Sequence, residues 1–173
     1  MNLPLAVEGY VLRDFRISDV DSLVRHANDP MVARWLRERF PSPYTRHDAT
    51  TWIRHRLAER PATNLAIANA HELIGGIGLE LEQDVYRHSA ELGYWLGKEF
   101  WALGIASAAA SRMCEYAFRD LDLMRLHASV FAPNLGSARV LEKAGFQCEG
   151  RRRDAVLKHG ELMDELVFAR LRK

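Results

Sequence analysis

The segment from Leu96 to Ser107 is the part of this sequence best suited to bind an anion. An apolar strand is expected to end near Leu96, and a helix rich in small residues begins at Gly104 after a short loop. The first backbone amides of a helix have no partners within the helix and lie at the positive end of its dipole, so they can bind a phosphate group. Glycine lets such a group approach the backbone closely. The same residues also fit a tight strand–helix turn whose small residues serve packing, and the segment alone does not separate the two interpretations.

Two other phosphate-binding patterns are absent. No Gly-Lys pair is followed by Ser or Thr, as a P-loop requires. Gly75, Gly76 and Gly78 do not complete the dinucleotide-binding pattern, because Leu81 holds its last position and the run lies within an expected strand. These glycines indicate instead a bulge or a close approach of backbone in the sheet.

The elements that would position the anion site alternate between strands and helices. Strands are expected at Tyr10–Phe15, Asn64–Ala68, Leu73–Glu82, Ala90–Gly97, Arg125–Phe131, Gln147–Leu157 and Leu162–Arg170. Helices are expected at Asp19–Ala27 with Ser18 as its cap, Met31–Arg39, Arg46–Glu59, Gly104–Arg119, and from Asn134 to Gly145. This order predicts a mixed α/β sheet with a strand–helix–strand unit at its centre, in one domain spanning residues 1–173.

Alternation in the strand Ala90–Gly97 assigns its side chains to two faces. Leu92, Tyr94 and Leu96 lie on one face, and Glu91, Gly93 and Trp95 on the other. In the following helix, the buried stripe is expected to be Ala106, Ala109, Ala110, Met113 and Ala117.

Composition excludes several classes of protein. The 173 residues are 48% hydrophobic and 27% charged, with a formal net charge of +1, which argues against disorder and against a strongly basic nucleic-acid-binding protein. No apolar run approaches the length of a membrane span, and the first residues do not resemble a secretory signal, so a cytoplasmic location is expected. Cys114 and Cys148 are expected to be reduced packing residues, and no histidine has metal-ligand spacing, so no metal site is expected.

Three segments taken in order carry a family resemblance. They are Ala90–Gly97, the loop and helix start from Trp101 to Ser107, and Pro133–Phe146. Together they resemble the GNAT superfamily of acetyl-CoA-dependent N-acetyltransferases, and more narrowly the RimJ/RimL-type branch of ribosomal-protein N-terminal acetyltransferases. The likeness extends to Phe40–Thr45 and to Arg153 onward, so it covers nearly the whole chain. It implies a mostly antiparallel central sheet of about six to seven strands, flanked by helices, with a splayed parallel pair at its centre.

The resemblance also implies a binding site for acetyl-CoA as co-substrate. The family's pyrophosphate loop matches Ala102, Leu103, Gly104, Ile105, Ala106 and Ser107. Trp101 stands where Gln or Arg is usual, and Ala102 where this branch often has Gly. We expect altered affinity and not loss of binding, because the site depends on backbone amides. Trp95 and Leu96 would line the gap between the splayed strands. Asn134 would face the cofactor, cap its helix, or do both.

For catalysis, the resemblance points to two side chains. Glu91 occupies the position of the general base in many superfamily members, and its alternative is a surface glutamate at the start of a strand. The usual acidic tyrosine is replaced by Leu141, which cannot donate a proton. The nearer branch places a serine at Ser137, whose hydroxyl would assist the departing thiolate or simply belong to the first turn of a helix.

The acceptor is implied only as a primary amine, on a protein N-terminus or a small molecule, bound near Phe40 and Tyr44. The sequence does not choose between these acceptors, or between a monomer and a homodimer. A catalytically idle acyl-CoA-binding module is a second hypothesis, because Trp101, Ala102 and Leu141 depart from the commonest pattern. An unrelated α/β binding domain with a purely structural turn at Gly104 is a third.

Overall fold

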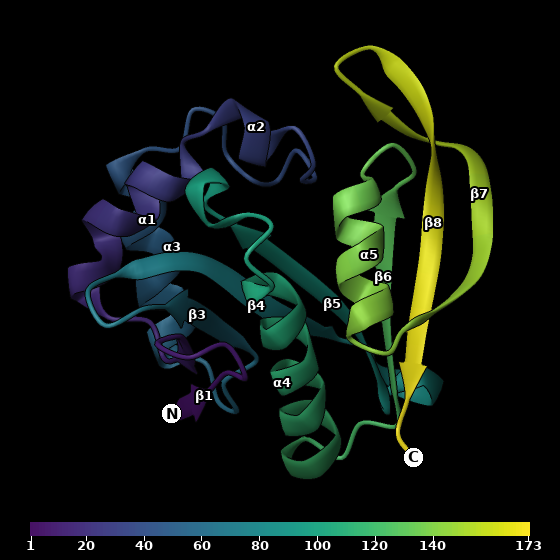
Figure 1. Ribbon diagram of the computed structural model, residues 1–173, viewed down its shortest axis with the longest axis horizontal. Coiled ribbons are helices and arrows are strands. Elements are labelled where there is room, and N and C mark those ends of the chain that lie inside the picture. Colours follow the sequence, from purple (N-terminus) through teal and green to yellow (C-terminus); the bar gives the residue numbers. More distant parts are fainter.

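The computed structural model describes all residues from 1 to 173 and contains one sheet with helices on both faces (Figure 1). The strands are β1 Asn2–Pro4, β2 Val11–Arg13, β3 Asn64–Ala68, β4 Leu73–Leu81, β5 Ser89–Leu96, β6 Arg125–Phe131, β7 Gln147–Lys158 and β8 Glu161–Leu171. The helices are α1 Val20–Ala27, α2 Pro30–Ala33, α3 Arg46–Ala58, α4 Ile105–Asp120 and α5 Leu135–Lys143. Short 3-10 turns occur at Ile17–Asp19, Asp84–Tyr86 and Lys98–Phe100.

The sheet has the strand order β1-β2-β3-β4-β5-β6-β8-β7, and every neighbouring pair is antiparallel except β5 and β6. This confirms the mixed α/β class, the mostly antiparallel sheet and the central parallel pair. The sheet has eight strands where about six to seven were predicted, because Asn2–Pro4 adds an edge strand. Three residues are too few to show a period-two pattern, so this strand could not be predicted from the hydrophobic pattern.

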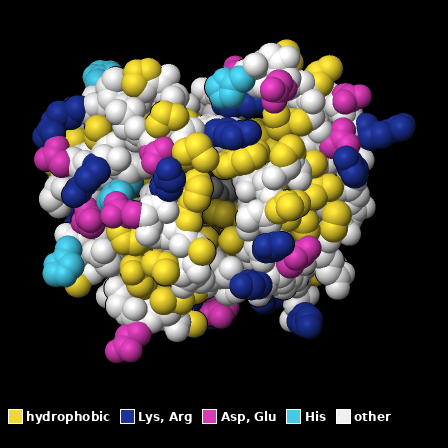
Figure 2. Space-filling view, turned by 45° about the horizontal axis from the view of Figure 1, so that its top comes forward, with side chains coloured by type: hydrophobic (Ala, Val, Ile, Leu, Met, Phe, Trp, Pro, Cys, Tyr) yellow, Lys and Arg dark blue, Asp and Glu magenta, His cyan; other side chains and the backbone are white.

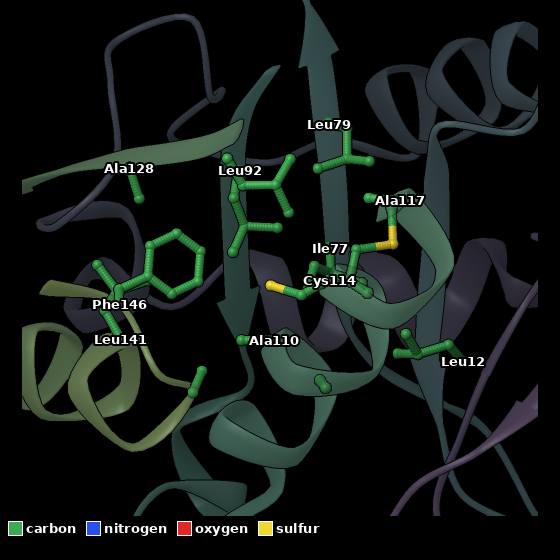
Figure 3. Close-up of a cluster of buried hydrophobic side chains, with 14 of the residues drawn as sticks. Leu12, Ile77, Leu79, Leu92, Ala110, Cys114, Ala117, Ala128, Leu141 and Phe146 are labelled. Carbon is green, nitrogen blue, oxygen red and sulfur yellow. The ribbon is translucent and has the colours of Figure 1, made fainter. Parts of the chain in front are cut away.

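Two hydrophobic clusters lie on opposite faces of the sheet. The larger packs α4 and α5 against the side-chain face that carries Leu92 and Leu96, and Figure 3 shows Cys114 of α4 and Leu141 of α5 within it. The smaller packs α1 and α3 against Ala66 and Leu73. In α4 the predicted stripe is buried apart from Ala106, which is only partly buried and packs against the cluster. Each face of the sheet is thereby covered by its own helices.

The start of α1 differs from the prediction. Ser18 makes no capping hydrogen bond and lies in a 3-10 turn that precedes the helix. Asp19 takes over the polar role, because its carboxylate accepts from the Arg16 amide at 2.7 Å and from both terminal nitrogens of buried Arg13 at 2.8 Å. A buried carboxylate with these partners is satisfied, and it ties the first turn of α1 to the end of β2.

The predicted helix 31–39 is also shorter in the structure, where α2 ends at Ala33. Asp29 caps it by accepting from the Met31 amide at 2.8 Å, with Pro30 at its first position. The chain then continues without regular structure from about residue 36 to residue 45. Arg37 and Arg39 therefore lie on a loop and not on a helix.

The glycine run in β4 makes the close approaches that the sequence indicated. A Cβ atom at Gly75 would lie 2.5 Å from the Trp95 carbonyl oxygen, and one at Gly76 would lie 2.8 Å from the Trp95 indole nitrogen. A Cβ atom at Gly78 would overlap the side-chain oxygen of Asn64. The absence of a side chain at Gly76 therefore leaves room for the large side chain of Trp95 on β5.

No helix of the molecule is both long enough and apolar enough to cross a bilayer. The structure also corrects one of the two cysteine predictions. Cys114 is fully buried in α4, as expected, but Cys148 is exposed on β7. Strand β7 is the outer strand of the sheet and is exposed along nearly its whole length, so apolar residues in it need not pack.

The two thiols are expected to differ sharply in reactivity. Burial raises the pKa of Cys114 to about 11, which leaves almost no thiolate at mildly alkaline pH. Titration of the native protein with a thiol-specific disulfide reagent should count one thiol, and denaturation in guanidinium chloride should raise the count to two. The variant Cys148→Ser should show no fast-reacting thiol when native. A fast reaction that persists in Cys148→Ser would contradict the burial of Cys114.

Candidate active site

Pairing between the two central strands stops early. Strand β5 pairs with β6 only over Ser89–Glu91, opposite Arg125–His127. Beyond this point β5 remains paired with β4, and β6 with β8 through Phe131. The facing edges of β5 and β6 therefore have no partner strand over their second halves. This is the splayed parallel pair that the resemblance implied, and it leaves backbone groups available to an extended ligand.

The start of α4 has the features of an anion site. Gly104 occupies the N-cap with φ 79°, and no side chain caps the helix. The amides of Ile105, Ala106 and Ser107 consequently have no partner within the helix. Ala102 adopts φ 61°, a left-handed conformation that costs an L-residue about 1–2 kcal/mol. This explains why the branch often has Gly there, and it shows that the loop keeps this conformation despite the alanine.

These features open into one large cavity of about 1410 Å³. Figure 2 shows a hollow near the middle of this face, bordered by hydrophobic side chains, with Lys or Arg side chains close to its rim. Most of the predicted site residues line it: Phe40, Tyr44, Glu91, Trp95, Leu96, Ala102, Gly104, Ile105, Ala106, Ser107, Asn134 and Ser137. The exception is Leu103, whose side chain is 55% exposed and does not line the cavity.

The loop between β5 and α4 is held by side chains on both sides. The Trp101 indole nitrogen donates to the Leu96 carbonyl at 2.7 Å, which joins the loop to the end of β5. On the outside, His26 of α1 packs against Gly97 and edge-on against Phe100, with ring centroids 5.4 Å apart. The His26 ring nitrogens lie 3.4 Å from Glu72 and 3.2 Å from Glu99. Trp101 therefore replaces the usual Gln or Arg with a side chain that fixes the loop.

A tyrosine that sequence reasoning did not select lies at the start of α5. The Tyr94 hydroxyl lies 2.7 Å from Ser137 Oγ and donates to the Ser137 carbonyl at 3.1 Å. Burial raises the pKa of Tyr94 to about 12, so its hydroxyl stays protonated under physiological conditions. The Asn134 side chain accepts from the Ser137 amide at 3.1 Å, which confirms that Asn134 caps the helix. The only signal in the sequence was the alternation of β5, which placed Tyr94 on the same face as Leu92 and Leu96.

Glu91 lies on the opposite side-chain face of β5, in line with Gly93 and Trp95. Their partners across β4 are Glu80, Gly78 and Gly76, respectively. Glu91 forms an ion pair with Arg37, and Arg39 contacts Glu80 through both terminal nitrogens, the shorter contact being 2.7 Å. The hydrogen bond from Arg39 holds the pKa of Glu80 below its ordinary value. Sequence reasoning missed both arginines because it placed them on a helix.

Aromatic side chains border the same face. The Phe40 ring centroid lies 5.0 Å from that of Tyr44 and 5.7 Å from that of Trp95. Tyr44 is buried, and this burial raises its pKa to about 12, whereas Phe40 is half-buried. The predicted acceptor residues therefore lie together beside β5, with Tyr44 mainly supporting Phe40.

Comparison with known proteins identifies the family. Residues 10–147 match the family described as "Acetyltransferase (GNAT) domain". The chain belongs to the GNAT acetyltransferase family. It is 31% identical over 172 residues to an uncharacterized N-acetyltransferase, p20, of Bacillus licheniformis, and the match covers 98% of this chain and 96% of that protein. GNAT members transfer an acetyl group from acetyl-CoA to an amine, and this chain is an acetyl-CoA-dependent N-acetyltransferase of that family.

Solved structures of other GNAT proteins share the fold. Mycobacterium smegmatis RimJ, solved with a CoA disulfide, has a TM-score of 0.82 at 26% identity, covering 99% of this chain and 86% of that one. RimL, described as a ribosomal L7/L12 N-terminal acetyltransferase in complex with coenzyme A, has a TM-score of 0.85 at 20% identity, covering 99% and 98%. The second likeness shows the fold alone.

The conformation of Gly104 allows a direct test of the α4 loop. A Cβ atom there would meet only Val7, at 4.0 Å, so Gly104→Ala adds backbone strain without a steric clash. We expect the free energy of unfolding to fall by about 1 kcal/mol, since the left-handed strain exceeds the gain from a stiffer unfolded chain. Urea denaturation followed by circular dichroism measures this change.

Gly150→Ala is the matched control, because that glycine has an ordinary φ and no atom within 4 Å of the added Cβ. This variant should lose no stability. Equal losses in both variants would contradict a specific conformational requirement at Gly104.

Proposed function

We propose that this GNAT enzyme acetylates a primary amine by direct attack in a ternary complex, with Glu91 as the general base and Ser137 assisting the departing thiolate. The observation that carries this proposal is that both side chains line one cavity at the point where β5 and β6 separate. They reach it from two different elements, β5 and α5. An acetyl group held between the strands would then lie between an amine on the Glu91 side and Tyr94–Ser137 on the other.

In this mechanism, Glu91 removes one proton from the acceptor ammonium, directly or through a water molecule. The free amine nitrogen forms a bond to the carbonyl carbon of the thioester, and the carbon–sulfur bond breaks. The sulfur leaves as thiolate and takes up the second proton of the amine, so that the products are an amide and a thiol. A hydrogen bond from Ser137 Oγ to the sulfur lowers the cost of the developing charge. Tyr94 fixes the position of that hydroxyl.

The cofactor residues follow from the same geometry. The amides of Ile105, Ala106 and Ser107 would bind the diphosphate of acetyl-CoA, with Ala102 and Gly104 shaping the loop. Leu103 would contribute its backbone only, since its side chain is turned away. Trp95, Leu96 and Asn134 would border the pantetheine arm. The fit is supported by the uncapped helix, the unpaired strand edges and the cavity volume.

An idle acyl-CoA-binding module is the second candidate. The strained Ala102 and the fully buried Leu141 favour it, because both depart from the common pattern of active members. The Tyr94–Ser137 contact weighs against an idle module. It places two hydroxyl groups beside the cavity, so a hydrogen-bond donor is present although Leu141 cannot act as one.

For the acceptor, we propose a primary amine on a small molecule or a protein N-terminus. The likeness to RimJ at 26% identity supports a place in the RimJ/RimL-type branch. We further propose that residues 1–173 form a single domain. We also propose that the chain acts in the cytoplasm, where acetyl-CoA and such amines are available.

Acetyl-CoA binding is the first test of this proposal. At a hundredfold excess over Kd, binding should add about 2.7 kcal/mol to the free energy of unfolding and raise Tm by roughly 5–10 °C. A thermal-shift titration measures this rise, with GTP as an unrelated nucleotide control. The absence of a shift with millimolar acetyl-CoA would contradict a donor site at the start of α4.

The catalytic roles are tested by Glu91→Gln and Ser137→Ala. Glu91→Gln should lower kcat by ~100-fold or more and alter its pH dependence while leaving the acetyl-CoA thermal shift intact, because only proton removal is lost. Ser137→Ala should lower kcat with an unchanged pH profile. Thiol release gives the rates in both cases. Unchanged rates would remove Glu91 from the mechanism and return Ser137 to helix capping.

A further inference from the structure

Every carboxylate that lines the cavity is already paired with an arginine. The pairs are Arg56 with Glu59, Arg39 with Glu80, Arg37 with Glu91, and Arg152 with Glu165. An incoming ammonium group therefore finds no free carboxylate. It has to compete with a guanidinium group for the carboxylate, and a guanidinium group that loses its partner must find another anion or remain unpaired at the cavity.

The Arg37–Glu91 pair can exchange and has the more accessible carboxylate of the two single-contact pairs, since Glu91 is 21% exposed and Glu165, the partner of Arg152, is 11% exposed. Arg56 and Glu59 are only 13% and 22% exposed, and Glu59 also accepts from the Thr63 and Asn64 amides. Arg39 binds both oxygens of Glu80. Arg37 makes one contact from a loop with a side chain that is 48% exposed, so it can move aside to admit a ligand between itself and Glu91.

We propose that Arg37 and Glu91 together form an acceptor subsite for α-amino acids, in which Glu91 receives the ammonium group and Arg37 binds the carboxylate. This inference rests on the proposed function, and it narrows the acceptor class. A zwitterion inserted between the two side chains replaces one ion pair by two, so no charge is left without a partner. A monoamine, an amino-acid amide or a protein N-terminus would leave Arg37 unpaired.

The surroundings of Glu91 provide room for such an acceptor. Gly93 follows Glu91 on the same face, and a Cβ atom there would meet nothing within 4 Å. Gly78 pairs with Gly93 on β4 and is covered by the Asn64 side chain, so the open part of the floor beside Glu91 lies at Gly93. Phe40 and Trp95 border this space. The acceptor therefore should carry an apolar side chain, which packs over Gly93 and against the two rings.

The test compares acceptors that differ only in the carboxylate. Apolar amino acids, among them leucine, methionine and phenylalanine, are each assayed against the corresponding amide and the corresponding amine without a carboxyl group. Thiol release at saturating acetyl-CoA gives kcat/KM for each. We expect at least one amino acid to exceed its amide by ~10- to 100-fold, the range of a charge-assisted contact.

Arg37→Ala separates recognition from a structural role, with Arg39→Ala as the matched control. In Arg37→Ala, kcat/KM for the preferred amino acid should fall by ~10- to 100-fold more than kcat/KM for the amine without a carboxyl group, because only the amino acid loses a contact. A purely structural role would lower both values to the same extent. Arg39→Ala should keep the preference for the amino acid over its amide, since Arg39 is paired with Glu80 and not with Glu91.

Two results would overturn the proposal. One is that no amino acid exceeds its amide although an amine or a peptide is acetylated. The other is that no free amino acid releases thiol from acetyl-CoA although a monoamine or a peptide does. Either result would leave the donor site and the acetyltransferase assignment intact. Failure of the proposed function itself is distinguishable, because it would show as an absent acetyl-CoA shift.

Discussion

The early end of pairing between β5 and β6 is the constraint on which the rest of this molecule depends. Two parallel strands that share only three paired positions must each be held by other partners, and here β4 and β8 hold them. Helices α4 and α5 then begin next to the opening, each presenting its N-terminus to the same cavity. The donor loop, the hydroxyl pair and the acceptor face are all arranged around this gap between two otherwise continuous halves of one sheet.

Much of this arrangement could be predicted from local patterns. The alternation in Ala90–Gly97 gave the correct faces of β5, and small residues after Gly104 gave the start of α4. The elements that escaped prediction lack such patterns. Strand β1 is too short for periodicity, and Asp19 replaced Ser18 because the distant Arg13 neutralises its charge. Cys148 looked like a packing residue only because a sequence does not show that β7 is an outer strand.

The candidate site was predictable in part, for a different reason. Glu91, Ser137 and the loop from Ala102 to Ser107 came from motif order, and all but the Leu103 side chain line the cavity. The contacts that modify their chemistry join residues 43 and 54 positions apart in the chain, Tyr94 with Ser137 and Arg37 with Glu91. No spacing rule relates such residues, because only the tertiary fold brings them together. Sequence motifs therefore locate the reacting groups, whereas the tertiary fold determines which side chains form hydrogen bonds or ion pairs with them.

The overlap of Trp95 with Gly76 has a consequence for how this enzyme can change. The indole of Trp95 occupies the space that a side chain on Gly76 would need. A lineage or a directed-evolution experiment that enlarges the residue at position 76 must first shrink the one at position 95, and the reverse order leaves a void to be refilled. The two positions should therefore vary together among descendants of this sequence. A change of acceptor that needs a larger residue at position 76 is then open only to proteins that already carry a smaller residue at position 95.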